Sequence, residues 1–171
     1  MSIFIPKIYQ KNIFDINYDY LKEKGIKYLI FDLDNTLGVV DEEVCSQKVC
    51  DLIKKLSNQF KIIVASNNNY ERVSIFCKEL NVKIIAMSFK PSGKVYRKIK
   101  KYTKNMEEVA MIGDQIMTDI LLGNRFNMLT ILVDPLEDKD LKITTLNRYL
   151  ENKIIKKIGF KRGVYYEKSK C

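Results

Sequence analysis

Residues 28–37 read Tyr-Leu-Ile-Phe-Asp-Leu-Asp-Asn-Thr-Leu, an apolar run that passes at once into two carboxylates. A short run of large apolar residues predicts a buried strand, here Lys27–Asp32. Asp32 and Asp34 stand two positions apart at its end, and like charges this close are costly unless they share a cation or a proton. Because Asp and Asn also favour turns, a strand ending in a turn without chemistry is the competing interpretation of this stretch alone.

The rest of the chain alternates short strands with helical stretches. Helices are predicted over Asp41–Asn58 and Asn69–Leu80, where apolar residues recur every three or four positions, and Pro91 suits the first position of another helix. This alternation, without hairpin signals, predicts an α/β fold: a three-layer sandwich whose mainly parallel five-stranded sheet lies between helices. The strands expected after the first are Lys61–Ser66, Lys83–Met87, Val109–Gly113 and Thr130–Asp134.

The chain is predicted to form one domain over residues 1–171, with an N-terminal arm at 1–26 and a basic helix and tail at 139–171. The tail carries ten Lys and Arg against three acidic residues, so it holds most of the net charge of +9. In one interpretation its lysines are solvated and its apolar stripe packs on the domain; in another it rests on an anionic membrane, and contact with RNA is a third. The stripe of the expected helix, 143–158, consists of Ile143, Leu146, Leu150, Ile154 and Ile158.

Composition excludes several kinds of chemistry. The 171 residues include no histidine, which rules out Ser-His-Asp catalysis and any metal or haem site that needs an imidazole. The four cysteines form no CxxC pair and are expected to be reduced. The apolar runs are strand-sized, far below the ~20 residues of a membrane span. Without a signal-peptide pattern at the start, the protein is expected in the cytoplasm.

Polar residues also follow the other predicted strands. In a parallel sheet the carboxyl ends of the strands lie along one edge, which is where ligands bind. A hard cation such as Mg²⁺ takes oxygen ligands there, usually one or two carboxylates together with a substrate phosphate. The candidates are Ser66 and Asn67 after the second strand, Lys90 after the third, and Asp114 and Asp119 after the fourth.

Together these residues resemble the four motifs of the haloacid dehalogenase (HAD) superfamily, which has a Rossmann-like fold. Four motifs in order, each at a predicted strand end, outweigh the interpretation of Asp32 and Asp34 as a plain turn. Motif I, DxDx[TV], is matched by Asp32, Asp34 and Thr36, motif II by Ser66, motif III by Lys90, and motif IV, GDxxxxD, by Gly113, Asp114 and Asp119.

Over residues 3–160 the chain resembles more narrowly the YqeG-type phosphatases of HAD subfamily IIIA, which are similar to phosphatidylglycerophosphate phosphatases. One departure is Gly38-Val39-Val40, where relatives often carry a bulky residue before an acidic one. The segments that carry this resemblance include Asp34-Asn35-Thr36-Leu37, Ser66-Asn67-Asn68, Lys90-Pro91-Ser92-Gly93-Lys94 and Gly123-Asn124-Arg125.

The resemblance implies a Mg²⁺-dependent phosphomonoester hydrolase. Asp32 would attack phosphorus and form an aspartyl-phosphate, while Asp34 would protonate the leaving oxygen and then activate water. The implied metal ligands are Asp32, the backbone carbonyl of Asp34, and Asp114, with Asp119 in support behind them. The implied phosphate-binding residues are Ser66, Asn67 and Lys90.

The substrate expected from the resemblance is phosphatidylglycerophosphate, met through peripheral contact with anionic lipid at the inner face of the membrane. The sequence has no room for a cap domain, so an open site could take a phosphate that projects from a large body. A soluble or nucleic-acid phosphate remains an alternative, as does a non-enzymatic module that binds RNA or the ribosome. Lys94 is read as a solvated lysine and Arg125 as a cation at a helix end, and a substrate role for either stays open.

Overall fold

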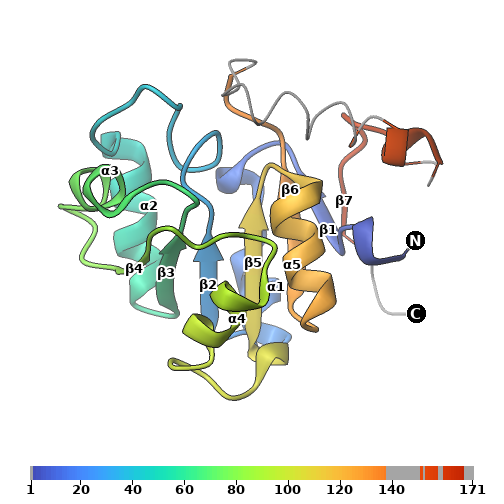
Figure 1. Ribbon diagram of the computed structural model, residues 1–171, viewed down its shortest axis with the longest axis horizontal. Helices are drawn as coiled ribbons and strands as arrows, with labels where there is room; N and C mark the ends of the chain where they lie inside the picture. Colours follow the sequence, from blue (N-terminus) through green and yellow to red (C-terminus); the bar gives the residue numbers. More distant parts are fainter. Residues whose placement is uncertain (1, 138–150, 152, 158–159, 168–171) are drawn as a thin grey trace.

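Seven strands form one sheet in the order β4-β3-β2-β5-β6-β1-β7 (Figure 1). The computed structural model describes residues 2–137, 151, 153–157 and 160–167. Neighbouring strands are parallel except β1 and β7, which are antiparallel. The strands are β1 Ile8–Gln10, β2 Tyr28–Phe31, β3 Lys61–Ala65, β4 Lys83–Ile85, β5 Val109–Gly113, β6 Leu129–Val133 and β7 Tyr166–Glu167.

Helices cover both faces of the sheet, which confirms the predicted α/β sandwich with a mainly parallel sheet (Figure 1). Side chains alternate along a strand, so Leu29 and Phe31 of β2 enter one core while Tyr28 and Ile30 enter the other. The first core is closed by α1 Tyr18–Glu23, α2 Gln47–Ser57 and α3 Tyr70–Phe76, and the second by α4 Gly93–Ile99 and α5 Leu121–Arg125. Short helical turns complete the chain: η1 Ser2–Phe4, η2 Ile13–Asp15, η3 Met106–Glu108 and the π-helical η4 Ile116–Ile120.

Helix α2 begins at Gln47, six residues later than the predicted start at Asp41. The segment before it is a loop whose carbonyls at Val39, Val40 and Glu42 accept hydrogen bonds from the Arg72 guanidinium. Because a side chain from another helix satisfies these carbonyls, the segment needs no helical hydrogen bonds of its own.

The sheet has seven strands where the sequence predicted five, because the two segments expected as appendages both add to it. The predicted arm supplies β1, which pairs with β6, and the tail supplies β7, which pairs with β1. Tyr9 of β1 is fully buried, and its ring centroid lies 5.1 Å from that of Phe160. Most of the helix predicted at 143–158 lies outside the described residues. The described residues within that range, 151 and 153–157, are helical.

The described part of the tail is anchored through a buried carboxylate. Glu151 is fully buried, and it accepts hydrogen bonds from the backbone N–H of Met117 and from the Arg162 guanidinium, both at 3.1 Å. Ile155, Phe160 and Tyr166 pack against the small core around Tyr9. The tail residues on this side therefore contribute to folding, whereas Lys156, Lys157 and Lys161 are exposed. No helix among the described residues has the length and apolar character to cross a membrane.

We predict that Phe160→Ala lowers the free energy of unfolding by about 2 kcal/mol, because it removes a half-buried ring from the core around Tyr9. Lys161→Ala, one position away and exposed, should change it by no more than about 0.5 kcal/mol. Urea denaturation followed by circular dichroism measures both. Equal stability of the two variants would show that the tail is not part of the fold.

Candidate active site

The predicted site residues gather at the carboxyl edge of the sheet. Asp32 directly follows β2, Ser66 follows β3 and Asp114 follows β5, while Lys90 lies on the loop between β4 and α4. These four side chains come from separate parts of the chain and are all buried, with exposures of 7% or less. The parallel register of β2 with both β3 and β5 places these strand ends together.

The Lys90 ammonium lies between two carboxylates. Its Nζ is 2.5 Å from Oδ1 of Asp32 and 2.7 Å from Oδ1 of Asp119. Burial by itself would lower the pKa of Lys90, but Asp119 and Asp32 outweigh it and raise the pKa above its usual value. The lysine is therefore a fixed positive charge that points at Asp32.

The two carboxylates that contact this lysine belong to a group of three: Asp32, Asp114 and Asp119 each offer an oxygen within 4.8 Å of the others. Burial, Asp119 and Asp114 raise the pKa of Asp32, against the opposing effect of Lys90. With all groups ionised the three carboxylates and one ammonium leave a local charge of −2, which suits a divalent cation. The donor set, all carboxylate oxygen, fits a hard metal ion.

We expected Asp119 to lie behind the metal ligands. In the structure its carboxylate belongs to the group of three and contacts Lys90 directly. Gly113 makes this possible, because a Cβ there would lie 2.3 Å from Cγ of Asp119. The same carboxylate accepts a hydrogen bond from the backbone N–H of Gln115 at 3.2 Å. Asp119 thus touches both the lysine and the start of η4.

Asp34 lies apart from this cluster and has its own partners. Its Oδ2 accepts a hydrogen bond from Asn68 at 2.6 Å, and its Oδ1 accepts one from Arg72 at 3.1 Å. Burial raises the pKa of Asp34, and the Arg72 guanidinium opposes that rise. The two aspartates of motif I therefore sit in different surroundings despite their spacing of two residues.

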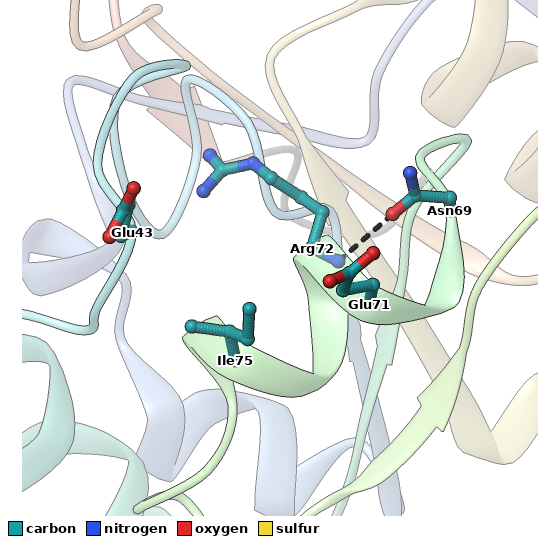
Figure 2. Close-up of a pocket in the computed structure, with 5 residues that line it drawn as sticks. All are labelled: Glu43, Asn69, Glu71, Arg72 and Ile75. Atoms are coloured by element: carbon teal, nitrogen blue, oxygen red, sulfur yellow. Dashed lines mark hydrogen bonds between the residues drawn. The ribbon is translucent and has the colours of Figure 1, made fainter.

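Arg72 is a site residue that the sequence reading missed. Besides Asp34 it donates to the carbonyls of Val39, Val40 and Glu42, so it joins motif I to the loop that follows it. Figure 2 shows its side chain rising from α3, beside a surface cavity of about 260 Å³ lined also by Glu43, Asn69, Glu71 and Ile75. One feature of the sequence could have indicated this role. A cation in the first turn of a helix is disfavoured by the helix dipole, so an arginine there is expected to have a specific partner.

Asn67 holds the loop that carries Lys90. Its Oδ1 accepts hydrogen bonds from the Ser88 hydroxyl at 2.7 Å and from the backbone N–H of Lys90 at 2.8 Å. Its amide nitrogen donates to the Lys90 carbonyl at 3.3 Å. These three hydrogen bonds all go to the loop that carries Lys90, so Asn67 supports that loop, and its expected part in phosphate binding stays a prediction.

The two flanking cations stay outside the cluster. Lys94 is exposed, and its Nζ lies 4.9 Å from the centroid of the Phe89 ring. Arg125 is also exposed, in the last turn of α5 over the Phe126 ring. Neither has a contact with the carboxylates around Lys90.

The fold is shared with solved hydrolases. A HAD-like family hydrolase from Porphyromonas gingivalis superposes with a TM-score of 0.54 at 15% sequence identity, over 73% of this chain and 98% of that chain. This likeness shows the fold, and the residues gathered at the carboxyl edge match the four HAD motifs. The fold and the motif residues together define the class of protein, that of the HAD-type hydrolases.

Sequence relatives define the family within that class. The probable phosphatase YqeG of Bacillus subtilis (strain 168) is 35% identical over 168 residues, 97% of this chain and 98% of the relative. Phosphatidylglycerophosphate phosphatase 1, chloroplastic/mitochondrial, of Arabidopsis thaliana is 29% identical, over 77% of this chain but only 41% of the plant protein. The profile of the mitochondrial PGP phosphatase family matches residues 1–137, and the chain belongs to that family. The protein is therefore a phosphatase of the HAD type, a phosphoric monoester hydrolase.

We predict that Arg72→Met lowers kcat at least about tenfold on an alkyl phosphate, because Asp34 and the 39–42 loop lose a shared donor. Arg72→Lys should recover only part of the rate, since one ammonium cannot match the planar fork of a guanidinium. Steady-state kinetics on glycerol phosphate and on p-nitrophenyl phosphate measure the effect.

The exposed Arg125→Met is the matched control and should keep the wild-type rate. The loss in Arg72→Met should be smaller on p-nitrophenyl phosphate, whose leaving group needs little protonation. An equal loss on both substrates would mean that Arg72 serves the loop alone and does not position Asp34.

Proposed function

We propose that this enzyme is a Mg²⁺-dependent phosphomonoester hydrolase in which Asp32 is the nucleophile. The observation that carries the proposal is the Lys90 ammonium, held 2.5 Å from Asp32 and 2.7 Å from Asp119 inside a buried group of carboxylates. A fixed cation at this place draws in a phosphate dianion, and it favours the ionised form of Asp32 against the burial that raises the pKa of this carboxyl. The attack of a carboxylate oxygen on phosphorus gives an aspartyl-phosphate and expels the alcohol.

Asp34 is the proposed acid and base. Its two oxygens are held by Asn68 and Arg72. It donates its proton to the leaving oxygen in the first step and takes one from water in the second. Since burial raises its pKa, the protonated form that the first step requires is available to it.

The phosphoryl oxygens would be bound by Ser66 and Lys90. Ser66 is 1% exposed at the end of β3, and its hydroxyl oxygen also accepts from the backbone N–H of Asn68 at 3.1 Å. We assign Asn67 to positioning, through the loop that it ties to Lys90. Preorganised donors of this kind stabilise the charge that develops on the transferring group.

Asp32, Asp114 and the backbone carbonyl of Asp34 would hold the Mg²⁺ ion, with Asp119 beside them. When bound, the ion would neutralise charge between the nucleophile and the phosphoryl group. The protein supplies the arrangement: carboxylates that follow β2 and β5, a third carboxylate on η4, and a glycine that lets Asp119 approach.

The substrate we propose is phosphatidylglycerophosphate. Membership of the PGP phosphatase family supports it, and so do the short segments at the positions where other HAD enzymes carry a cap. The positions at which HAD enzymes insert caps hold a loop at residues 35–46, and α3 with β4 between Ser66 and Lys90. A site without a cap accepts a phosphate carried by a lipid in a bilayer. The proposed place of work is the cytoplasmic face of an anionic membrane, which is a reducing compartment. The described cysteines Cys45, Cys50 and Cys77 are free, as such a compartment favours.

We predict that Asp32→Asn lowers phosphatase activity at least about a thousandfold, because the amide cannot attack phosphorus. The exposed Asp19→Asn should be as active as the wild type. Hydrolysis of p-nitrophenyl phosphate should stop in excess EDTA and return when Mg²⁺ is restored. Wild-type turnover that continues in EDTA would contradict the metal assignment.

The same metal site should be visible without turnover. Added Mg²⁺ should raise the melting temperature of the wild-type enzyme, since a ligand that binds only the folded state stabilises it. Asp114→Asn should remove most of that rise because it removes a carboxylate from the cluster.

We predict that phosphatidylglycerophosphate in detergent micelles is hydrolysed with a kcat/KM at least about tenfold above those of phosphosugars, nucleotides and phosphopeptides. Phosphate release measured across this panel tests the substrate. A soluble ester that surpasses the lipid would leave the proposed chemistry in place but replace the proposed substrate.

A further inference from the structure

The loop that carries Lys90 alternates buried and exposed residues. Ser88 and Lys90 are buried at the site, whereas Met87 and Phe89 are 51% and 49% exposed. Both apolar residues have positive φ, 44° and 56°, a region in which large side chains are uncommon. Because about half of each side chain is exposed, neither Met87 nor Phe89 owes its place to packing in a hydrophobic core.

This conformation is held from both sides. The backbone N–H of Met87 donates to the Asn68 carbonyl at 2.8 Å, and that of Ser88 donates to the Ser66 carbonyl at 3.0 Å. The Lys98 ammonium donates to the Ala86 carbonyl at 3.1 Å. The two exposed tips are therefore fixed relative to Lys90 and the phosphate site.

The chain segment that carries these tips is basic. Residues 80–106 contain eight Lys and Arg and no acidic residue. Lys94 and Arg97 are exposed on α4, and Lys94 covers the Phe89 ring. The acidic residues Glu43 and Glu71 belong to other segments and line the cavity beside α3 (Figure 2).

We propose that Met87, Phe89, Lys94, Arg97 and Lys98 form a docking surface for an anionic lipid bilayer. Apolar tips that enter the interface, flanked by basic residues that meet anionic headgroups, are the combination that holds a protein on such a membrane. An RNA partner would use the cations but gain nothing from a methionine tip. The inference rests on the proposed lipid substrate and adds the face through which the enzyme meets it.

The position of the surface suits catalysis on a lipid phosphate. Phe89 is adjacent to Lys90 in the chain, so docking would bring the headgroup layer to the mouth of the site. The tail lysines, by contrast, lie on the segment whose apolar residues pack around Tyr9 of β1, and four strands of the sheet separate β1 from β4. A membrane that rests on α4 thus needs no contribution from the tail.

Flotation with vesicles of phosphatidylglycerol and phosphatidylcholine tests the proposal on the full chain. The double variant Met87→Asn/Phe89→Asn removes both apolar side chains and replaces them with asparagine, which tolerates positive φ. This variant should bind the vesicles about tenfold or more weakly than the wild type. Lys94→Glu/Arg97→Glu should do the same, and added salt should weaken the binding of the wild type. Pure phosphatidylcholine vesicles should bind little of any variant.

Two matched controls change the same residue types elsewhere. Ile3→Asn/Tyr102→Asn removes exposed apolar side chains before β1 and after α4. Lys54→Glu/Lys55→Glu reverses two exposed charges in the last turn of α2. Both should bind anionic vesicles as the wild type does. Reversal of Lys153, Lys156, Lys157 and Lys161 should also leave binding intact, and loss of binding in that variant alone would move the docking site to the tail and overturn the proposal.

Soluble activity separates this inference from the proposed function. All variants should hydrolyse p-nitrophenyl phosphate at the wild-type rate. Hydrolysis of the lipid substrate in detergent micelles measures activity on the lipid without a bilayer. If the wild type fails on the lipid in micelles, the proposed substrate fails, while vesicle binding still tests the surface. If the docking-surface variants bind vesicles as tightly as the wild type, or lose affinity for RNA instead, the membrane assignment is wrong.

Discussion

The contact on which this site depends is the buried Lys90 ammonium between Asp32 and Asp119. Three carboxylates within 4.8 Å of one another would repel strongly at the end of a buried sheet, and the lysine offsets part of that cost. The remaining negative charge is what makes the place suitable for a divalent cation. A structure that neutralised these charges completely would be more stable but would have nothing left to attract a metal and a phosphate.

The fold delivers this contact through backbone that contributes no chemistry itself. The register of β2 against β3 and β5 aligns the residues that follow each strand. Gly113 leaves the space that Asp119 occupies, and Asn67 fastens the loop behind Lys90. Each of these parts is local, yet together they join segments that lie more than fifty residues apart in the chain.

Much of this arrangement could be predicted from the sequence, because it follows from periodicity and from the rule that parallel strands end at one edge. The strand at Val109–Gly113 is found as predicted, and Lys90 points at Asp32. Contacts that depend on tertiary placement could not be predicted. Arg72 reads as a surface helix residue until the 39–42 loop folds over it, and Glu151 reads as one acid in a basic tail until its burial against Met117 is seen.

The spacing of Asp32 and Asp34 also acquires its meaning only in the folded chain. Residues two apart would share one environment on a regular strand, but here the chain turns after Asp32, and Asn35 donates its backbone N–H to Gly38 at 2.7 Å. Asp32 then faces Lys90, whereas Asp34 faces Asn68 and Arg72. A nucleophile must stay ionised and an acid must hold a proton, and two carboxylates can divide these roles only if their surroundings differ. The turn in motif I thus provides two different environments within three residues: burial raises the pKa of both carboxyls, and the opposing cation is Lys90 at Asp32 but chiefly Arg72 at Asp34.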